Sequence, residues 1–360
     1  MKQYKVGVLG ATGMVGQRFI SLLEHHPWFT VTVVAASSKS AGKTYTQAVN
    51  GHWLMDSPIP SKTGDLVVLD AEHDAKTISQ SVDLVFCAVN MEKEQTRKLE
   101  EMYAHLECPV ISNNSAHRWT EDVPMVIPEI NPEHLSLIEA QRKRLGTRRG
   151  FIAVKSNCSL QSYVPALHPL LKFGLEKILV CTYQAISGAG KTFETWPEMV
   201  DNCIPFIDGE EAKSEREPLK LWGELKDQQI HIAEKPTITS QCIRVPCSDG
   251  HLAACFMEFS DKTKPTLEQI RNEWATFIGL PQKLLLPSAP KQFLHYREEN
   301  DRPQTKKDRM SENGMAISIG RLRPDSQYDF KFICLSHNTI RGAAGGAILL
   351  AELLCAQGYI

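Results

Sequence analysis

The segment from Tyr4 to Ala36 restricts the fold more than any other part of this sequence. An apolar run at residues 4–9 precedes the glycine-rich segment GATGMVG at 10–16, and an amphipathic run at 17–26 leads to a second strand pattern at 30–35. This order predicts a parallel βαβ unit. Its turn brings backbone amides and a helix N-terminus close to a pyrophosphate, so we expect a dinucleotide here. The alternative is a tight turn that holds no ligand.

The residues after the second strand indicate which dinucleotide binds. An NAD site usually carries an acidic residue there for the ribose 2′-hydroxyl, but residues 35–43 contain none. Hydroxyls and two cations stand there instead, and they suit a 2′-phosphate: Ser37, Ser38, Lys39, Ser40 and Lys43. The sequence therefore favours NADP over NAD. A polar surface loop is the alternative for the two lysines.

Further strand patterns at 66–69, 82–89 and 109–112, with a helix pattern at 92–105, predict a doubly wound parallel sheet of the Rossmann-like α/β class. Ligands of such sheets gather at the carboxyl ends of the strands. Arg118 follows the strand at 109–112, so it is a candidate anion clamp. An exposed loop arginine is the alternative.

The segment KSNCSLQ at 155–161 contains the candidate nucleophile. A strand pattern at 150–154 and a helix pattern at 159–170 place Cys158 at a strand-to-helix junction. The helix dipole and free backbone N–H groups lower the pKa of a thiol there, and the thiolate is the reactive form. The alternative is a small buried residue at a tight turn.

After Cys158 the pattern changes to longer strands with intervening helices, which predicts a second domain of α+β type. A strand at 177–186 contains Gln184, a candidate polar contact, and ends in the flexible turn SGAG at 187–190. Glu210 and Lys213 lie three residues apart and share a face if they are helical. A surface ion pair is the alternative for them, and a charged helix is expected at 214–226.

Two β runs at 237–246 and 251–259 flank a polar turn with glycine, which predicts a hairpin. If its centre lies between Cys247 and Ser248, Arg244 and His251 stand opposite each other on one face. Arginine can hold a carboxylate and histidine can transfer a proton near neutral pH. The alternative is a core or surface histidine.

The remaining segment is expected to contain an excursion or oligomer contact at 282–312 and a strand pair at 315–321 and 328–336. Asn338 is then expected to cap a buried terminal helix.

Composition excludes several classes of function. The 360 residues, 42% apolar and 23% charged, suit a globular protein of two domains. The net charge of −2 gives no general attraction to nucleic acid or to membranes. No signal core and no apolar stretch of about eighteen residues is present, so a cytoplasmic location is expected. The ten cysteines are scattered without metal-ligand spacing, which predicts reduced thiols and no metal.

Six motifs in this order resemble those of the aspartate-semialdehyde dehydrogenases, most closely the branch typified by archaeal and fungal enzymes. They span nearly the whole chain: GATGMVG at 10–16, SNCS at 156–159, QAISGAG at 184–190, EEAK at 210–213, residues 244–251 and NTIRGAAGG at 338–346. The resemblance implies an NADP-binding domain at 1–156, a catalytic and dimerisation domain at 157–337, and a C-terminal helix at 338–360 that returns to the first domain.

The resemblance also implies roles for residues. Cys158 would be the acyl-thioester nucleophile, His251 the acid/base and Gln184 the residue that orients the substrate. Arg244 would hold the substrate α-carboxylate and Glu210 its amino group. Lys213 and Arg118 would bind phosphate, and Asn157 would also contact substrate. Residues implied to contact NADP are Gly10, Thr12, Gly13, Met14, Val15, Ser37, Ser38, Lys39, Ser40, Ser187, Gly188 and Asn338.

The implied activity is NADPH-dependent reductive dephosphorylation of 4-phospho-L-aspartate to L-aspartate 4-semialdehyde, in the biosynthesis of lysine, diaminopimelate, threonine and methionine. The family forms homodimers or homotetramers. One departure is Leu160-Gln161, where members of this branch more often carry Thr-Ala.

Malonyl-CoA reductases share this framework, but a malonyl group has no amine for Glu210 to contact. A reductase of the acetylglutamyl-phosphate type also shares the general plan and does not need the Glu210 and Lys213 pair. A binding protein that had lost catalysis would lack the cysteine or the histidine, and both Cys158 and His251 are present.

Overall fold

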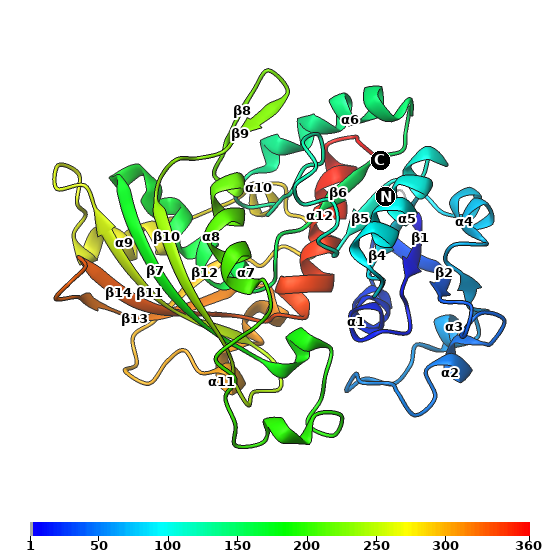
Figure 1. The fold of residues 1–360 in the computed structure, drawn as a ribbon, viewed down its shortest axis with the longest axis horizontal. Helices are drawn as coiled ribbons and strands as arrows, with labels where there is room; N and C mark the ends of the chain where they lie inside the picture. The colour runs from blue at the N-terminus through cyan, green and yellow to red at the C-terminus, as the bar shows by residue number, and fades with distance from the viewer. Residues whose placement is uncertain (1–2) are drawn as a thin grey trace.

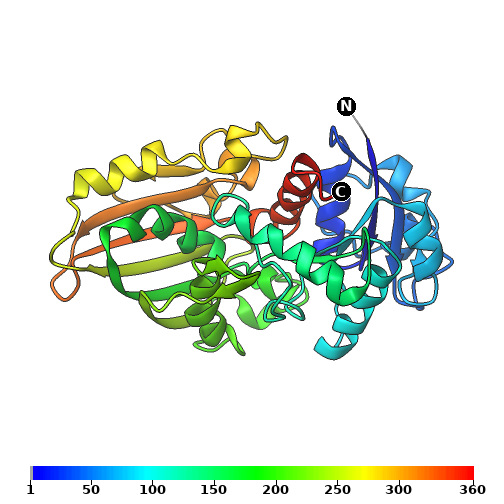
Figure 2. The ribbon, with the colours of Figure 1, turned by 90° about the horizontal axis from the view of Figure 1, so that it is seen from above.

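A computed structural model describes residues 3–360, so the first two residues of the predicted domain 1–156 lie outside the described residues. The chain forms two bodies side by side, each built on a six-stranded sheet (Figures 1 and 2). The first sheet is entirely parallel, with strand order β3-β2-β1-β4-β5-β6. This confirms the predicted Rossmann-like class.

The strands of the first sheet are β1 (Tyr4–Leu9), β2 (Phe29–Ala36), β3 (Leu69–Asp70), β4 (Leu84–Cys87), β5 (Val110–Ser112) and β6 (Ile152–Val154). The helices of this half are α1 (Met14–Leu23), α2 (Tyr45–Ala48), α3 (Ser61–Gly64), α4 (Ala75–Ser81), α5 (Lys93–His105) and α6 (Leu137–Leu145). The strand predicted at 66–69 is shorter than expected, because only Leu69 belongs to β3 and Val67 makes an isolated bridge to Thr44.

The glycine-rich turn joins β1 to α1 as the sequence predicts. Gly10 has a φ of 78°, a backbone conformation that favours glycine. A Cβ atom on Gly16 would lie 2.1 Å from the carbonyl oxygen of Gly10, whereas one on Gly13 would meet nothing closer than 3.6 Å. Gly16 therefore allows the helix to pack tightly against the turn.

The second sheet has strand order β10-β7-β11-β14-β13-β12. Its strands are β7 (Leu175–Gln184), β10 (Thr237–Arg244), β11 (His251–Phe259), β12 (Leu294–Arg297), β13 (Ile317–Pro324) and β14 (Phe330–Ser336). The associated helices are α7 (Leu160–Leu167), α8 (Glu210–Leu221), α9 (Leu267–Thr276), α10 (Leu280–Lys283) and α11 (Thr305–Asp308). A small hairpin of β8 (Glu224–Lys226) and β9 (Gln229–His231) projects separately (Figure 1).

The predicted hairpin of residues 237–259 is wrong. β10 and β11 do not pair with each other, because β7 lies between them and pairs with β10 in parallel and with β11 in antiparallel orientation. The turn at 247–250 therefore crosses the end of β7. Arg244 and His251 still come together, but across the end of a third strand.

Other predicted boundaries shift by a few residues. The charged helix begins at Glu210 rather than at 214, so Glu210 and Lys213 share its first turn. The helix expected at 159–170 ends as an α-helix at Leu167 and continues as a 3-10 helix over His168–Phe173, where Pro169 removes a helical N–H donor. The segment 282–312 contributes β12 to the sheet edge rather than only an excursion.

The last helix, α12 (Gly345–Ala356), follows a π-helical turn over Ile340–Ala344. Both views place it between the two bodies (Figures 1 and 2). Its leucines share one apolar cluster with β1, α1 and β4, and His26 forms a 2.7 Å contact with the buried Glu352. The domain boundaries given above remain predictions. Within residues 3–360, no helix has the length and hydropathy that a membrane span requires.

Gly16 and Gly13 provide a matched test of how tightly α1 packs against the glycine-rich turn. Gly16→Ala should lower the melting temperature by several degrees, since relief of the clash with Gly10 costs about 1–3 kcal/mol. Gly13→Ala should melt within a degree or two of the unsubstituted protein. Differential scanning calorimetry measures both. Equal melting temperatures for the two variants would contradict the account.

Candidate active site

The candidate site lies where β6 leads into α7, beside the ends of β7 and β10 and the start of β11. Cys158 comes directly before the N-terminus of α7, which confirms the predicted strand-to-helix junction. Cys158 as a residue is partly exposed. Its Sγ lies 3.5 Å from Nε2 of His251, so the structure brings the predicted nucleophile and the predicted acid/base into contact.

The imidazole of His251 has a defined orientation. Its Nδ1 accepts a 3.1 Å hydrogen bond from the backbone N–H of Ala185. The proton of the neutral ring is therefore assigned to Nε2, which faces the thiol. Burial, and next the positive charge of Arg244, lower the pKa of His251 well below its usual value. His251 is thus a neutral hydrogen-bond donor at neutral pH.

The expectation of a lowered thiol pKa is contradicted. Burial, and next the carboxylate of Glu210, raise the pKa of Cys158, whereas Lys155, Arg118 and Arg244 act in the opposite sense. The helix N-terminus is present, but desolvation disfavours the thiolate more strongly than the local dipole and the surrounding cations favour it. The thiol is therefore protonated at neutral pH in this structure.

Arg244 and Gln184 lie beside this pair at the end of the sheet. The guanidinium of Arg244 donates a 2.6 Å hydrogen bond to the carbonyl of Ala185. A Cβ atom on Gly188 would lie 2.9 Å from Arg244 and 3.0 Å from His251, so a side chain there would crowd both. Gln184 donates to Glu210 at 3.3 Å. These side chains form one wall of the site.

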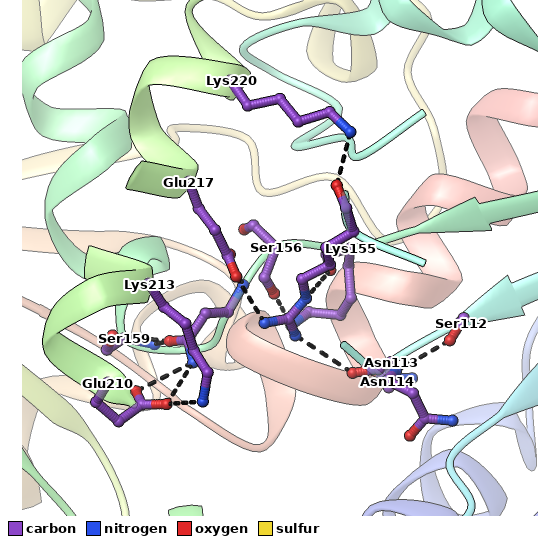
Figure 3. Close-up of polar contacts among 12 residues, drawn as sticks. Ser112, Asn113, Asn114, Lys155, Ser156, Ser159, Glu210, Lys213, Glu217 and Lys220 are labelled. Carbon is purple, nitrogen blue, oxygen red and sulfur yellow. Dashed lines mark hydrogen bonds and ion pairs between the residues drawn. The ribbon is translucent and has the colours of Figure 1, made fainter. Parts of the chain in front are cut away.

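Helix α8 contributes Glu210, Lys213 and Glu217 to the site (Figure 3). Glu210 accepts from Nζ of Lys213 at 2.8 Å, which confirms that the two share a helix face. Both carboxylate oxygens of Glu210 also accept from the side-chain amide of Asn157, at 2.9 and 3.0 Å. Asn157, Glu210 and Lys213 thus lie in one chain of contacts, which Gln184 joins at Glu210.

Arg118 is buried, so the alternative of an exposed loop arginine is excluded. It forms a 3.0 Å ion pair with Glu217 of α8. The sequence interpretation did not select Glu217, nor the buried Lys155 and Lys220. One signal was available: residues 210, 213, 217 and 220 follow the spacing of a single helix face.

A cavity of about 320 Å³ opens at the glycine-rich turn. Predicted NADP contacts that line it are Gly10, Thr12, Gly13, Ser37 and Ser38. Met14 and Ser187 line a second cavity beside it, whereas Val15, Lys39 and Ser40 line neither. Asp70 at the end of β3 also lines the first cavity, an acid that the sequence interpretation did not consider.

Asn338 does not cap the terminal helix, and that prediction is wrong. Its side-chain oxygen accepts from the backbone of Gly250 and its amide donates to Ser187, both at 2.8 Å. These bonds tie the segment before α12 to two loops of the site. The next turn approaches the nucleophile directly, because a Cβ atom on Gly342 would lie 2.9 Å from Cβ of Cys158.

Gln161, one of the two residues that depart from the family pattern, has a structural partner. It donates to Ser156 at 2.8 Å and accepts from Arg341 at 3.0 Å. Arg341 in turn forms a fully buried pair with Glu129. Gln161 therefore links the segment that contains Cys158 to the π-helical turn at Ile340–Ala344.

A parallel dinucleotide-type sheet beside a cysteine–histidine pair is the arrangement of a dehydrogenase that works through a cysteine. The sequence matches two family models: the NAD-binding domain of semialdehyde dehydrogenases over residues 5–138, and their dimerisation domain over residues 167–341.

Individual relatives agree. The chain is 43% identical to the aspartate-semialdehyde dehydrogenase of Archaeoglobus fulgidus, over 99% of this chain and all of that one, and 38% identical to that of Saccharomyces cerevisiae, over 98% of each. The crystal structure of the Candida albicans aspartate-semialdehyde dehydrogenase with NADP matches with a TM-score of 0.88 and 36% identity, over the whole of both chains. This chain therefore belongs to the aspartate-semialdehyde dehydrogenase family.

The raised thiol pKa gives a prediction that needs no substrate. Alkylation of Cys158 by iodoacetamide should accelerate with pH to a midpoint above the ordinary thiol value of about 8.5, because only the thiolate reacts. Peptide mass spectrometry after timed quenching separates Cys158 from the other cysteines. A plateau already reached at neutral pH would contradict the assignment.

Proposed function

We propose that this protein is an NADP-dependent aspartate-semialdehyde dehydrogenase that converts 4-phospho-L-aspartate to L-aspartate 4-semialdehyde, in the biosynthesis of lysine, diaminopimelate, threonine and methionine. The observation that carries the proposal is the 3.5 Å contact between Cys158 and His251 at the N-terminus of α7. Full-length similarity to enzymes of that name supports the substrate.

Cys158 is the proposed nucleophile. Its sulfur attacks the acyl carbon of the substrate, the new S–C bond replaces the bond from carbon to the phosphate oxygen, and phosphate leaves with the proton of the thiol. The Nε2–H group of His251 donates a hydrogen bond to the acyl oxygen while negative charge develops there. Release of the aldehyde would follow once the thioester carbon has accepted a hydride: the C=O bond then forms again, the C–S bond breaks, and the sulfur of Cys158 takes up a proton.

The polar side chains around Cys158 supply the substrate contacts. Arg244 is proposed to hold the α-carboxylate, and Glu210 the amino group, with Gln184 orienting the acyl group. Arg118 and Lys213 are proposed to hold the phosphate. Because Lys213 is paired with Glu210 and Arg118 with Glu217, a bound phosphate adds to or exchanges these ion pairs. Asn157 keeps Glu210 beside the nucleophile.

The residues at the glycine-rich turn fit NADP. Gly13 begins α1 without a side-chain cap, so the first N–H groups of the helix are available to a pyrophosphate. Ser37 and Ser38 line the same cavity at the end of β2 and suit the 2′-phosphate. When bound, NADPH supplies the hydride that reduces the thioester carbon.

Substitution of the nucleophile tests the reaction. NADP⁺ reduction with L-aspartate 4-semialdehyde, followed at 340 nm, should require inorganic phosphate and should be abolished in Cys158→Ala. NADP⁺ affinity, measured by fluorescence titration, should stay within a few fold because Cys158 lies outside the cavity at the glycine-rich turn. A Cys158→Ala variant that kept its turnover would refute the thioester route.

Malonyl-CoA with NADPH is the matched alternative substrate. It should not be consumed, since it offers no amine to Glu210. Consumption of malonyl-CoA with an inert semialdehyde would leave the nucleophile in place but overturn the substrate roles of Glu210 and Lys213.

We also propose that the protein is a homodimer, or a tetramer built from dimers, joined through the second sheet. The family model for residues 167–341 is named for dimerisation. One face of this sheet packs on α7, α8 and α9, and the alternate side chains on the other face are apolar and partly exposed: Leu179, Cys181, Leu252, Ala254, Phe256 and Ile333.

No disulfide joins cysteines within residues 3–360, which suits the reducing cytoplasm that we propose as the location of the protein.

A charge in this sheet face should separate the subunits. Phe256 lies opposite Leu179 on the neighbouring strand, so Phe256→Glu should shift the mass measured by light scattering after gel filtration from the oligomer toward the monomer. Ile278→Glu is the control, because Ile278 is 59% exposed at a different place. A Phe256→Glu variant with unchanged mass would place the interface elsewhere.

A further inference from the structure

The buried carboxylate of Glu217 holds two parts of the site at once. One oxygen accepts from the guanidinium of Arg118 at 3.0 Å, and the other accepts from the backbone N–H of Asn157 at 2.8 Å. The side chain is 1% exposed, so these bonds form away from solvent. Figure 3 shows the carboxylate of Glu217 pointing away from α8, toward Ser156.

Arg118 and Asn157, the two partners of Glu217, both have a place in the proposed reaction. Asn157 precedes Cys158 in the chain, so its peptide group fixes the start of the turn that presents the thiol. Arg118 is the proposed phosphate ligand, and it also donates to the carbonyls of Lys155 at 3.2 Å and Asn113 at 3.5 Å. These three contacts leave two of the five guanidinium N–H groups for a ligand.

We propose that Glu217 is a positioning residue, which fixes the guanidinium of Arg118 relative to the backbone of Asn157 and thereby sets the distance between the bound phosphate group and the thiol of Cys158. The proposal rests on the proposed function for the identity of that phosphate. Attack of the sulfur on the acyl carbon and loss of phosphate from that carbon require both groups to be placed to within about an ångström.

A second residue of the same helix face supports this arrangement. Lys220 lies one turn beyond Glu217 and donates to the backbone carbonyl of Arg118 at 2.6 Å. Helix α8 therefore holds Arg118 at its side chain through Glu217 and at its backbone through Lys220 (Figure 3). Because the same helix carries Glu210 and Lys213, one rigid element sets the positions of the amino-group contact and both phosphate contacts.

A neutral side chain cannot replace this carboxylate. Both oxygens of Glu217 accept from N–H donors, whereas glutamine has one accepting oxygen and one NH2 group that only donates. In Glu217→Gln the amide group must therefore face either Arg118 or Asn157 with a donor. The substitution also leaves the charge of Arg118 without its carboxylate partner. Because this positive charge lowers the pKa of Cys158, its effect on the thiol should become stronger.

Steady-state kinetics and alkylation together test the proposal with Glu217→Gln. Turnover in semialdehyde oxidation should fall by about 10- to 100-fold, the effect expected for loss of a hydrogen bond to a charged group. The KM for phosphate should not rise, because Arg118 keeps its charge and loses a competing carboxylate. Alkylation of Cys158 by iodoacetamide should shift to lower pH. A purely structural defect would reduce turnover without this shift.

Two further variants complete the test. Glu217→Asp keeps the charge but shortens the side chain, so turnover should fall while the alkylation profile stays unchanged; this variant also decides the question if Glu217→Gln does not fold. Glu215→Gln is the control on the same helix, because Glu215 contacts Ser240 instead. Wild-type turnover in both Glu217 variants would overturn the proposal, as would an unshifted alkylation profile in Glu217→Gln.

The alkylation profile requires no substrate. If the unsubstituted protein did not reduce NADP⁺ with the semialdehyde, the proposed function would fail, and the profile of Glu217→Gln would still report whether Glu217 controls the surroundings of Cys158.

Discussion

The candidate site depends on the position of β7 between β10 and β11. Parallel pairing sets Arg244 opposite Gln184, and antiparallel pairing starts β11 at the same end of the strand. The backbone of Ala185 then donates to His251 through its N–H and accepts from Arg244 through its carbonyl. Because a β-ladder fixes the separation of its strands, these side chains keep their spacing without a dedicated loop to hold them. The wall formed by Gln184, Arg244 and His251 is thus a product of sheet topology.

Ion pairs organise the part of the site that α8 contributes. Cations near the thiol would each be costly to bury alone, and α8 supplies the matching carboxylates: Glu210 for Lys213 and Glu217 for Arg118. The same carboxylates receive hydrogen bonds from the side chain and the backbone of Asn157. Two cations of the site are thus paired with carboxylates before an anionic ligand enters, whereas Lys155 and Arg244 donate to backbone carbonyls.

Local patterns in the sequence predicted the features that depend on local physics. The glycine-rich turn, the position of Cys158 before a helix and the shared face of Glu210 and Lys213 follow from backbone conformation and helix periodicity. The prediction of a hairpin between Arg244 and His251 was wrong, because β7, from much earlier in the chain, pairs with both β10 and β11. The thiol pKa was wrong in direction because burial is a tertiary property. Asn338 bonds to distant loops instead of its own helix for the same reason.

The packing of α12 has a consequence for the order in which the chain can fold. Its leucines Leu349, Leu350, Leu353 and Leu354 are fully buried in the same apolar cluster as Val6 and Phe19. The nascent chain emerges N-terminus first, so β1 and α1 leave the ribosome long before the helix that completes their core. The apolar residues of the first sheet that pack against α12 therefore stay uncovered until the whole of the second body has been synthesised.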